Sequence, residues 1–217
     1  MQESGNPCIF IPYQRDLAMK TLCNPGMLLL LIMLTNTGIM SQQPAQDVFT
    51  VIHNRKSVRQ YADKPVENEK VETLLKAAMA APTARNIQPW LFYVITSRQV
   101  LDQLAADLPY AKMLAHAPMA IVVAGDTHKG NPNQEQKLNW ALDCSAATQN
   151  LLLAAEALGL GAVWTGVFPY SQRVEAVSQA LELPAHIIPL NVIPVGYPAS
   201  DEQPKDKWDP EKIRWID

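Results

Sequence analysis

The chain has 217 residues, of which 48% are hydrophobic, and it carries a formal net charge of −3 at pH 7 with a pI near 5.8. This length suits one domain with a sizeable core, and the acidic balance excludes a broad nucleic-acid-binding surface, so any anion site must be local. The three cysteines form neither a CxxC pair nor a cysteine–histidine ligand set, which argues against a disulfide framework or a structural zinc site.

Residues 1–44 differ from the rest of the chain and predict an N-terminal extension ahead of a domain over 45–217. The apolar run MLLLLIML (27–34) is far shorter than the ~20 residues that a membrane span requires. A start at Met19 would give a basic beginning, an apolar stretch and a polar segment up to Gln46, which is the layout of a secretory signal. The cleavage site is poor, so an extension without a signal function is the alternative. Localisation stays open between the cytoplasm and the periplasm.

The first half of the domain alternates between helical and strand patterns. Pro82 ends the second helix and Ser97 is the candidate N-cap of the third. The predicted elements are, in order, a short core-facing helix over 47–55, a helix over 66–84, a buried strand over 90–96, a helix over 97–108 and a short helix over 110–117.

The second half continues the alternation. Its predicted elements are a buried strand over 118–126, a long helix over 134–161, a strand over 162–168, a helix capped by Ser171 over 171–183 and a strand over 187–198. The long helix is rich in Ala and Leu and is expected to be buried nearly all round, in the core or at a subunit interface. Prolines in the last strand suggest an edge or a bulge. The fold class is therefore α/β or α+β, with a central sheet covered by helices.

The segment NRKSVRQY (54–61) gathers three cations around one serine. Arg55 and Arg59 are one helical turn apart, so in a helix they share a face with Ser57 between them. Guanidinium groups and a hydroxyl suit a phosphate because charge-assisted hydrogen bonds are strong. The alternative is a solvated basic helix end.

Three other segments have unusual composition. In AAPTARNIQPW (80–90), Asn86 and Gln88 can match the donor and acceptor edge of a heterocycle, whereas Trp90 is better explained as core. In VWTGVFP (163–169), backbone N–H groups can point at a planar ligand, or the segment is a plain turn. Lys205 and Lys207 in the polar tail read, by themselves, as solvated surface. Neither GxGxxG after a strand nor GxxxxGK[ST] is present.

In this order and spacing, the segments resemble the nitroreductase family of FMN-dependent oxidoreductases. The resemblance covers roughly residues 46–212 and rests on RKSVRQY, APTARNIQPWLFYVI, ALDCSAATQNLLLAAEALGLGAVWTG, and PVGYP followed by a basic tail. It implies a central, mainly antiparallel sheet flanked by helices in an intertwined homodimer. It also implies two FMN sites at the subunit interface, each built from both chains.

The resemblance also assigns roles to individual residues. The phosphate and ribityl region would be held by Arg55, Ser57 and Arg59, with Lys56 adding backbone or charge and Lys205 or Lys207 joining from the tail. The flavin would be lined by Pro82, Thr83 and Ala84 from the partner chain, and met at its edge by Asn86 and Gln88. Trp164, Thr165 and Gly166 occupy the place where the family offers a backbone N–H to flavin N5. Some members have an acidic residue before that glycine, whereas this chain has Thr165.

The resemblance implies an oxidoreductase with a ping-pong mechanism. NAD(P)H reduces bound FMN, and the reduced FMN then reduces small electron-poor acceptors such as nitroaromatics or quinones. No catalytic acid or base need be prominent, because the flavin carries the chemistry. The alternatives are a flavin-binding or storage protein with little turnover, a specialised dehalogenase, flavin-fragmenting or azoline-oxidising member, or a structural domain without a ligand. An exported protein would need another reduced donor, because NAD(P)H is scarce outside the cytoplasm.

Overall fold

A computed structural model describes residues 47–130, 133 and 137–216. The predictions for residues 1–44 and for a signal segment lie outside these residues. In the part that is described, no helix is both long and apolar enough to cross a membrane.

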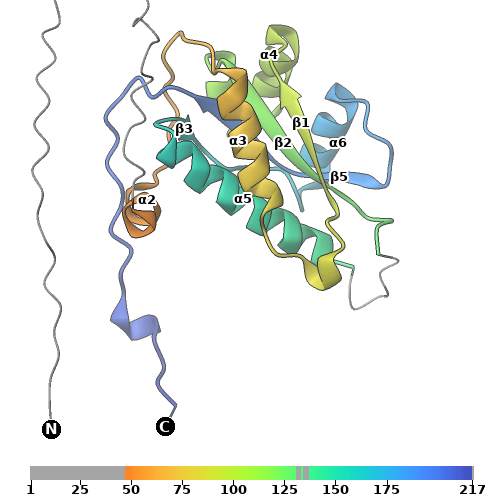
Figure 1. Ribbon diagram of the computed structural model, residues 1–217. Coiled ribbons are helices and arrows are strands. Elements are labelled where there is room, and N and C mark those ends of the chain that lie inside the picture. Colours follow the sequence, from red (N-terminus) through yellow and green to blue (C-terminus); the bar gives the residue numbers. More distant parts are fainter. Residues whose placement is uncertain (1–46, 131–132, 134–136, 217) are drawn as a thin grey trace, which may run out of the picture. The chain divides into compact units, whose positions relative to one another are not determined.

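A five-stranded sheet forms the centre of the domain (Figure 1). Its order is β1-β2-β5-β3, β4 also pairs with β5, and every strand pairing is antiparallel. The strands are β1 (Trp90–Ile95), β2 (Met119–Asp126), β3 (Gly161–Ala162), β4 (Thr165–Gly166) and β5 (Ile187–Gly196). The predicted fold class, a mainly antiparallel sheet flanked by helices, is confirmed.

Helices α3 and α5 cover one face of the sheet, and α4 and α6 cover the other. The helices are α2 (Val48–Asn54), α3 (Asn68–Met79), α4 (Arg98–Asp107), α5 (Asn139–Ala157) and α6 (Ser171–Ala180), with 3₁₀ turns η1 (Ala84–Asn86), η2 (Lys112–Ala115) and η4 (Pro210–Lys212). One core lies between the sheet and α3 and α5, and a second lies between the sheet and α4 and α6.

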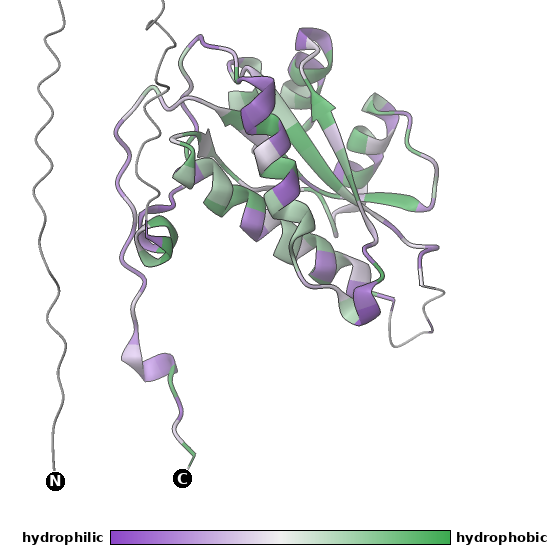
Figure 2. Cartoon of the chain, viewed as in Figure 1, coloured by the Kyte–Doolittle hydropathy of each residue, from purple (hydrophilic) through white to green (hydrophobic). Residues whose placement is uncertain are grey.

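Strand β2 has core on both of its sides. Ile121 and Val123 belong to the core under α3 and α5, whereas Ala120 and Val122 belong to the core under α4 and α6. Successive side chains of a strand point to opposite faces, so a strand covered on both faces is a continuous apolar run. Figure 2 shows the central strands in the hydrophobic colour, whereas α3 mixes hydrophobic and hydrophilic residues.

Two strand predictions are corrected, and one that left two alternatives is decided. Strand β1 is at the outer end of the sheet, and Leu91 and Val94 are exposed, so it is only partly buried. The single strand predicted over 162–168 is two short strands. For strand β5 the prediction was an edge or a bulge, and the bulge is confirmed: the strand lies inside the sheet, and its register with β2 shifts at Leu190.

Helix ends also differ from the predictions. Ser97 makes no side-chain capping bond, and Ser171 is the first helical residue of α6 rather than its cap. Helix α5 begins at Asn139 rather than at 134, and it ends before Gly159, whose φ of +70° suits glycine at a helix end. In α2 only Val51 is buried, so the expected core-facing stripe is mostly exposed in the single chain.

Candidate functional site

A basic groove joins the segment after α2 to the C-terminal tail. Its volume is about 490 Å³, and its lining residues are Arg55, Lys56, Ser57, Arg59, Glu202, Gln203, Lys205 and Lys207. Five cationic side chains therefore face one carboxylate, in a chain whose net charge is negative. The structure brings together the two basic segments that the sequence analysis had assigned to one phosphate.

The segment after α2 is not helical, which corrects the reason given for its shared face. Helix α2 ends at Asn54, and Ser57 and Tyr61 form isolated bridges to Ala162 and Pro198. In an extended chain alternate residues share a side, so the face of Arg55, Ser57 and Arg59 follows from a period of two. Of the intervening side chains, Val58 packs in the core, whereas Lys56 also lines the groove and reaches Glu156.

Val58 and Lys56, which lie between these residues, attach the segment to β3 and α5. Val58 is 1% exposed, and its N–H donates to the Ala162 carbonyl at 3.1 Å. The Lys56 ammonium pairs with Glu156 of α5 at 3.2 Å. The charge of Lys56 is therefore paired within the chain, by a residue 100 positions away.

Tyr61 anchors the far end of the same segment. Its hydroxyl donates to the carbonyl of Val58 at 2.7 Å and lies 3.3 Å from that of Pro194. Burial, with a smaller contribution from Glu202, raises the pKa of Tyr61 well above its ordinary value. The phenol thus stays protonated as a donor, and the basic segment has a rigid support.

The remaining cations of the groove are available to an anion. Within the described residues, the side chains of Arg55, Lys205 and Lys207 make no hydrogen bond or ion pair, and Arg59 reaches only the Ser57 carbonyl, at 3.4 Å. One carboxylate oxygen of Glu202 is buried without a partner. A phosphate would find unpaired guanidinium and ammonium groups here.

The Thr165–Gly166 strand lies close to this segment along the sheet, because Ser57 bridges Ala162 and both short strands pair with β5. The Thr165 hydroxyl turns inward and donates to the Val192 carbonyl, so it is not presented to a ligand. A methyl group added at Gly166 would meet only Trp164 Nε1, at 3.9 Å. The backbone at Gly166 therefore borders open space that a planar ligand can approach.

Residues 82–88, which the resemblance places against the flavin, form a tight loop after the end of α3. The Thr83 hydroxyl accepts from the Gln88 N–H at 3.2 Å, and the Gln88 side-chain amide donates to Asn86 at 2.8 Å. Asn86 and Gln88 both have left-handed backbone, with φ of 56° and 51°, and both are exposed. Such non-glycine conformations persist only where their surroundings hold them, and they are common at ligand sites. Trp90 is 7% exposed, so its assignment to the core is confirmed.

One chain does not bring this loop to the basic groove. The loop is tied to the start of α5, because the Ala84 N–H donates to Asp143 at 3.0 Å, whereas the groove is tied to its end through Glu156. The two anchors, Asp143 and Glu156, are 13 positions apart in α5, which corresponds to about 20 Å along the helix axis. The predicted site residues therefore form two groups at opposite ends of α5.

The profile of the Nitroreductase family matches residues 52–108 and 102–197. The chain belongs to the nitroreductase family. A relative from Methanothermobacter thermautotrophicus, named "Putative NADH dehydrogenase/NAD(P)H nitroreductase", is 43% identical over 169 residues, which are 77% of this chain and 85% of the relative.

Solved structures of other nitroreductase-like proteins have the same fold. A Parabacteroides distasonis crystal structure with the same name is 53% identical and has a TM-score of 0.74, covering 78% of this chain and 98% of the other. A structure from Desulfovibrio desulfuricans, described as a "putative nitroreductase" in complex with FMN, is 30% identical with a TM-score of 0.67, covering 79% and 98%.

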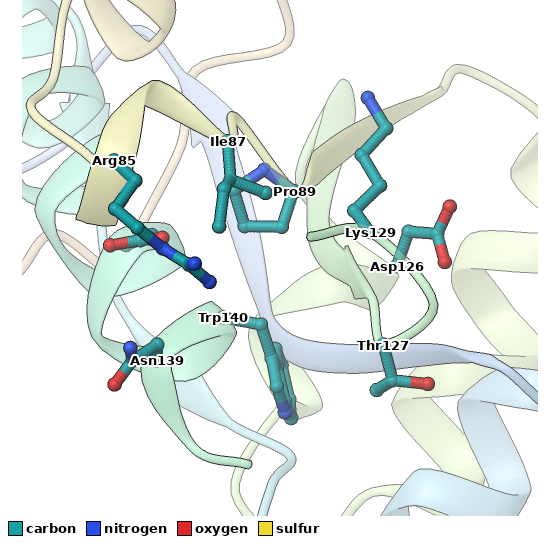
Figure 3. Close-up of a pocket in the computed structure, with 9 residues that line it drawn as sticks. Arg85, Ile87, Pro89, Asp126, Thr127, Lys129, Asn139 and Trp140 are labelled. Atoms are coloured by element: carbon teal, nitrogen blue, oxygen red, sulfur yellow. The ribbon is translucent and has the colours of Figure 1, made fainter. Parts of the chain in front are cut away.

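The chain also has cavities around Trp140, which were not predicted from the sequence. A small cavity lies between the 82–88 loop and the start of α5, and Arg85, Asp126, Lys129 and Trp140 are among the residues around it (Figure 3). A larger one, about 620 Å³, is lined by Thr127, His128, Lys137, Leu138, Trp140, Phe168 and Ile188. The available signal was Trp140, a large aromatic residue at the end of the mostly polar segment 126–140.

Proposed function

We propose that the chain is an NAD(P)H-dependent FMN oxidoreductase. The observation that carries the proposal is the basic groove, where Arg55, Ser57 and Arg59 meet Lys205 and Lys207 from a segment nearly 150 positions away. A local concentration of unpaired cations in an acidic chain fits a phosphate-bearing cofactor. The relative from Methanothermobacter thermautotrophicus has NAD(P)H nitroreductase in its name, and the structure from Desulfovibrio desulfuricans is a complex with FMN.

Each groove residue has a specific role in the proposal. Arg55 and Arg59 bind the FMN phosphate through charge-assisted hydrogen bonds, and Ser57 adds its hydroxyl. Lys205 and Lys207 add positive charge from the tail. Lys56 acts as a positioning residue, because its pair with Glu156 fixes the backbone that carries Ser57.

The proposed active unit is a homodimer with FMN at the interface. The ribityl chain of one FMN is much shorter than the distance between the two ends of α5, so Pro82, Thr83, Ala84, Asn86 and Gln88 line the flavin bound to the other copy. Large apolar side chains on α2 and the tail support a second copy as their cover. Within the described residues, the exposed fractions are 67% for Phe49, 73% for Trp208 and 85% for Trp215.

Bound FMN would supply two-electron redox chemistry between NAD(P)H and a nitroaromatic, quinone or similar acceptor. The chain's own residues bind, orient and shield. Gly166 leaves room for close approach to the backbone, and Asn86 and Gln88 present amide groups to the edge of a heterocycle. A ping-pong order follows if donor and acceptor use the same open face in turn.

The test is an absorbance spectrum of the purified full chain, followed by anaerobic addition of NADH or NADPH and then of a quinone. Flavin bands that bleach with the nucleotide and return with the quinone are expected. Bands that persist with both nucleotides would indicate a binding role or another donor. A colourless protein that takes up no added FMN would overturn the proposal. Sedimentation of the flavin-loaded protein as a monomer would overturn its dimeric part.

A further inference from the structure

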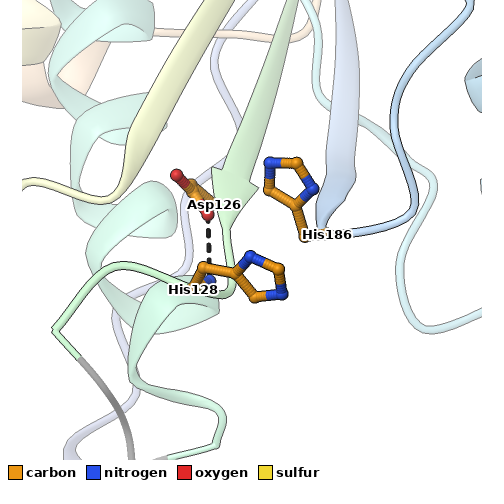
Figure 4. A group of neighbouring side chains, drawn as sticks. All are labelled: Asp126, His128 and His186. Carbon is orange, nitrogen blue, oxygen red and sulfur yellow. Dashed lines mark hydrogen bonds between the residues drawn. The ribbon is translucent and has the colours of Figure 1, made fainter.

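Two histidines that are far apart in the sequence meet beside an aspartate at one end of the sheet. His128 follows β2, His186 precedes β5, and Asp126 ends β2 (Figure 4). The two imidazole rings stack with their centroids 4.5 Å apart and their planes 7° from parallel.

We propose that Asp126, His128 and His186 bind a divalent transition metal ion of the Zn²⁺ type. One potential ligand atom from each residue lies within 4.8 Å of the other two. Two imidazole nitrogens and a carboxylate oxygen form a donor set that suits Zn²⁺, Ni²⁺ or Cu²⁺, whereas Mg²⁺ and Ca²⁺ prefer oxygen ligands alone.

The backbone around the three residues is already braced. The N–H and the hydroxyl of Thr127 both donate to the His186 carbonyl, each at 2.9 Å, which ties the end of β2 to the approach to β5. Asp126 Oδ1 accepts the His128 N–H at 2.9 Å, so the same residue shapes the turn that carries His128. A metal would therefore join side chains whose backbones are fixed relative to each other.

The neighbouring cation does not compete for the carboxylate. The Lys129 ammonium reaches the Gln88 carbonyl at 3.3 Å, and Asp126 has no ion pair with any described residue. The second carboxylate oxygen of Asp126 is thus available as a ligand.

Closure of the site needs only a side-chain movement. Ligand atoms at about 2.1 Å from a tetrahedral metal lie roughly 3.4 Å apart, so the groups must close by about 1.4 Å at most from their present spacing. Imidazole lone pairs lie in the ring planes, and these planes are now parallel, so one ring must turn. His128 is exposed and free to do so, whereas His186 and Asp126 are half-buried.

Metal binding would also fix one wall of the larger cavity near Trp140. His128 and Thr127 line that cavity, about 620 Å³ in volume, together with Trp140 and Phe168. A metal held by His128 and His186 would set the position of the His128 ring at its rim. The inference is independent of the proposed flavin chemistry, because the basic groove shares no lining residue with this site.

The test is Zn²⁺ titration by calorimetry on the tag-free full chain after treatment with a chelator and its removal. One Zn²⁺ per chain is expected, with no competition from excess Mg²⁺. His128→Ala and His186→Ala should each weaken binding by at least about tenfold, and Asp126→Asn, which keeps the Oδ1 acceptor, should weaken it by about tenfold. His116→Ala, at an exposed histidine elsewhere, is the matched control and should leave the affinity unchanged.

Co²⁺ provides a second readout of the ligands. Its long-wavelength absorption bands in the wild type should report nitrogen ligation and should disappear in both histidine variants, whose thermal unfolding midpoints without metal verify folding. Absence of saturable Zn²⁺ binding would overturn the proposal. Binding that both histidine variants retain would overturn it too, since it would place the metal elsewhere.

Discussion

The ammonium group of Lys56 lies 3.2 Å from a carboxylate oxygen of Glu156, and the two residues are 100 positions apart in the chain. Their side chains are only 22% and 15% exposed. The pair joins the segment that carries Ser57 to the last turns of α5. Half-buried charges are screened less than exposed ones, so this contact should contribute measurably to stability.

Glu156→Gln removes the charge of the partner and leaves Lys56 half-buried and unpaired. We expect the free energy of unfolding to fall by about 1–2 kcal/mol, between the values for exposed and fully buried pairs. The matched control is Glu72→Gln, which breaks an exposed pair with Lys76 and should change the free energy of unfolding less, because solvent screens exposed pairs. Denaturant unfolding of both variants measures the difference, and equal losses would contradict the structural role of the pair.

Arg55→Ala combined with Ser57→Ala removes a guanidinium and a hydroxyl from the basic groove. Hydrogen bonds to charged groups contribute about 1.5–3 kcal/mol each, so the dissociation constant of FMN should rise at least about tenfold. Flavin retained after dialysis measures the effect. Lys76→Ala, an exposed cation outside the groove, serves as the control. Unchanged flavin occupancy in the double variant would remove the phosphate assignment.

Lys207→Ala should weaken FMN binding less than the change at Arg55 and Ser57. A tail lysine is a flexible, exposed point charge, whereas arginine offers a planar fork of donors. The loss should be a few-fold at low salt and should shrink as salt increases, because exposed charges are screened. Lys205→Ala measured alongside decides which tail lysine is closer to the phosphate. A loss as large as that of the double variant, unaffected by salt, would contradict this ranking.

The basic groove was predicted from the sequence, but the helical arrangement assumed for its residues is corrected by the structure. The composition of NRKSVRQY pointed to an anion, and the resemblance joined it to Lys205 and Lys207, which the groove confirms as neighbours. The shared face was attributed to a helical turn, whereas it arises from extended chain paired with Ala162. Such pairing is a long-range contact, and local periodicity carries no information about it.

The same limit explains the other differences. Prolines in β5 indicated an edge or a bulge, and only the strand pairing, which shifts at Leu190 inside the sheet, decides between them. The meeting of His128 with His186 depends on the antiparallel register of β2 and β5, which brings Asp126 opposite Ile187. The long apolar strand β2 was predicted well, because burial on both faces leaves a continuous apolar run. Helix α5 was predicted with longer bounds, and Leu142 on it is exposed in the single chain.

Gly166→Ala tests whether Gly166 contacts the flavin, because this change should affect flavin binding without affecting stability. Within the protein the new methyl group meets nothing closer than Trp164 Nε1 at 3.9 Å, so stability should stay within about 0.5 kcal/mol of the wild type. If the flavin lies against this backbone, FMN affinity or the rate of reduction by NADH should fall.

The control for that change is Gly161→Ala on the neighbouring strand. There the methyl group would lie 2.6 Å from the Val58 side chain, so unfolding should become easier by about 1–3 kcal/mol. A Gly166→Ala protein with wild-type flavin affinity and turnover would show that the flavin does not approach Gly166.

Cys144 should be unreactive in the native protein. It is fully buried in α5, and burial, with a smaller effect of the Asp143 charge, raises the pKa of its thiol to about 12. Thiolate is the nucleophile, so a Cys8→Ser/Cys23→Ser chain should react with a disulfide reagent at pH 8 only after unfolding. Labelling of the native protein at the rate seen in urea would contradict the burial of this thiol.

The same pKa predicts how stability changes at high pH. Above about pH 9, the ordinary pKa of the group, the unfolded chain loses the Cys144 proton while the folded chain keeps it until about pH 12. The folded state then binds more protons, so the free energy of unfolding falls as pH rises, by at most about 1.4 kcal/mol per unit from this group. Cys144→Ala should unfold with a shallower dependence over that range. Identical slopes for the two proteins would show that the thiol titrates alike in both states.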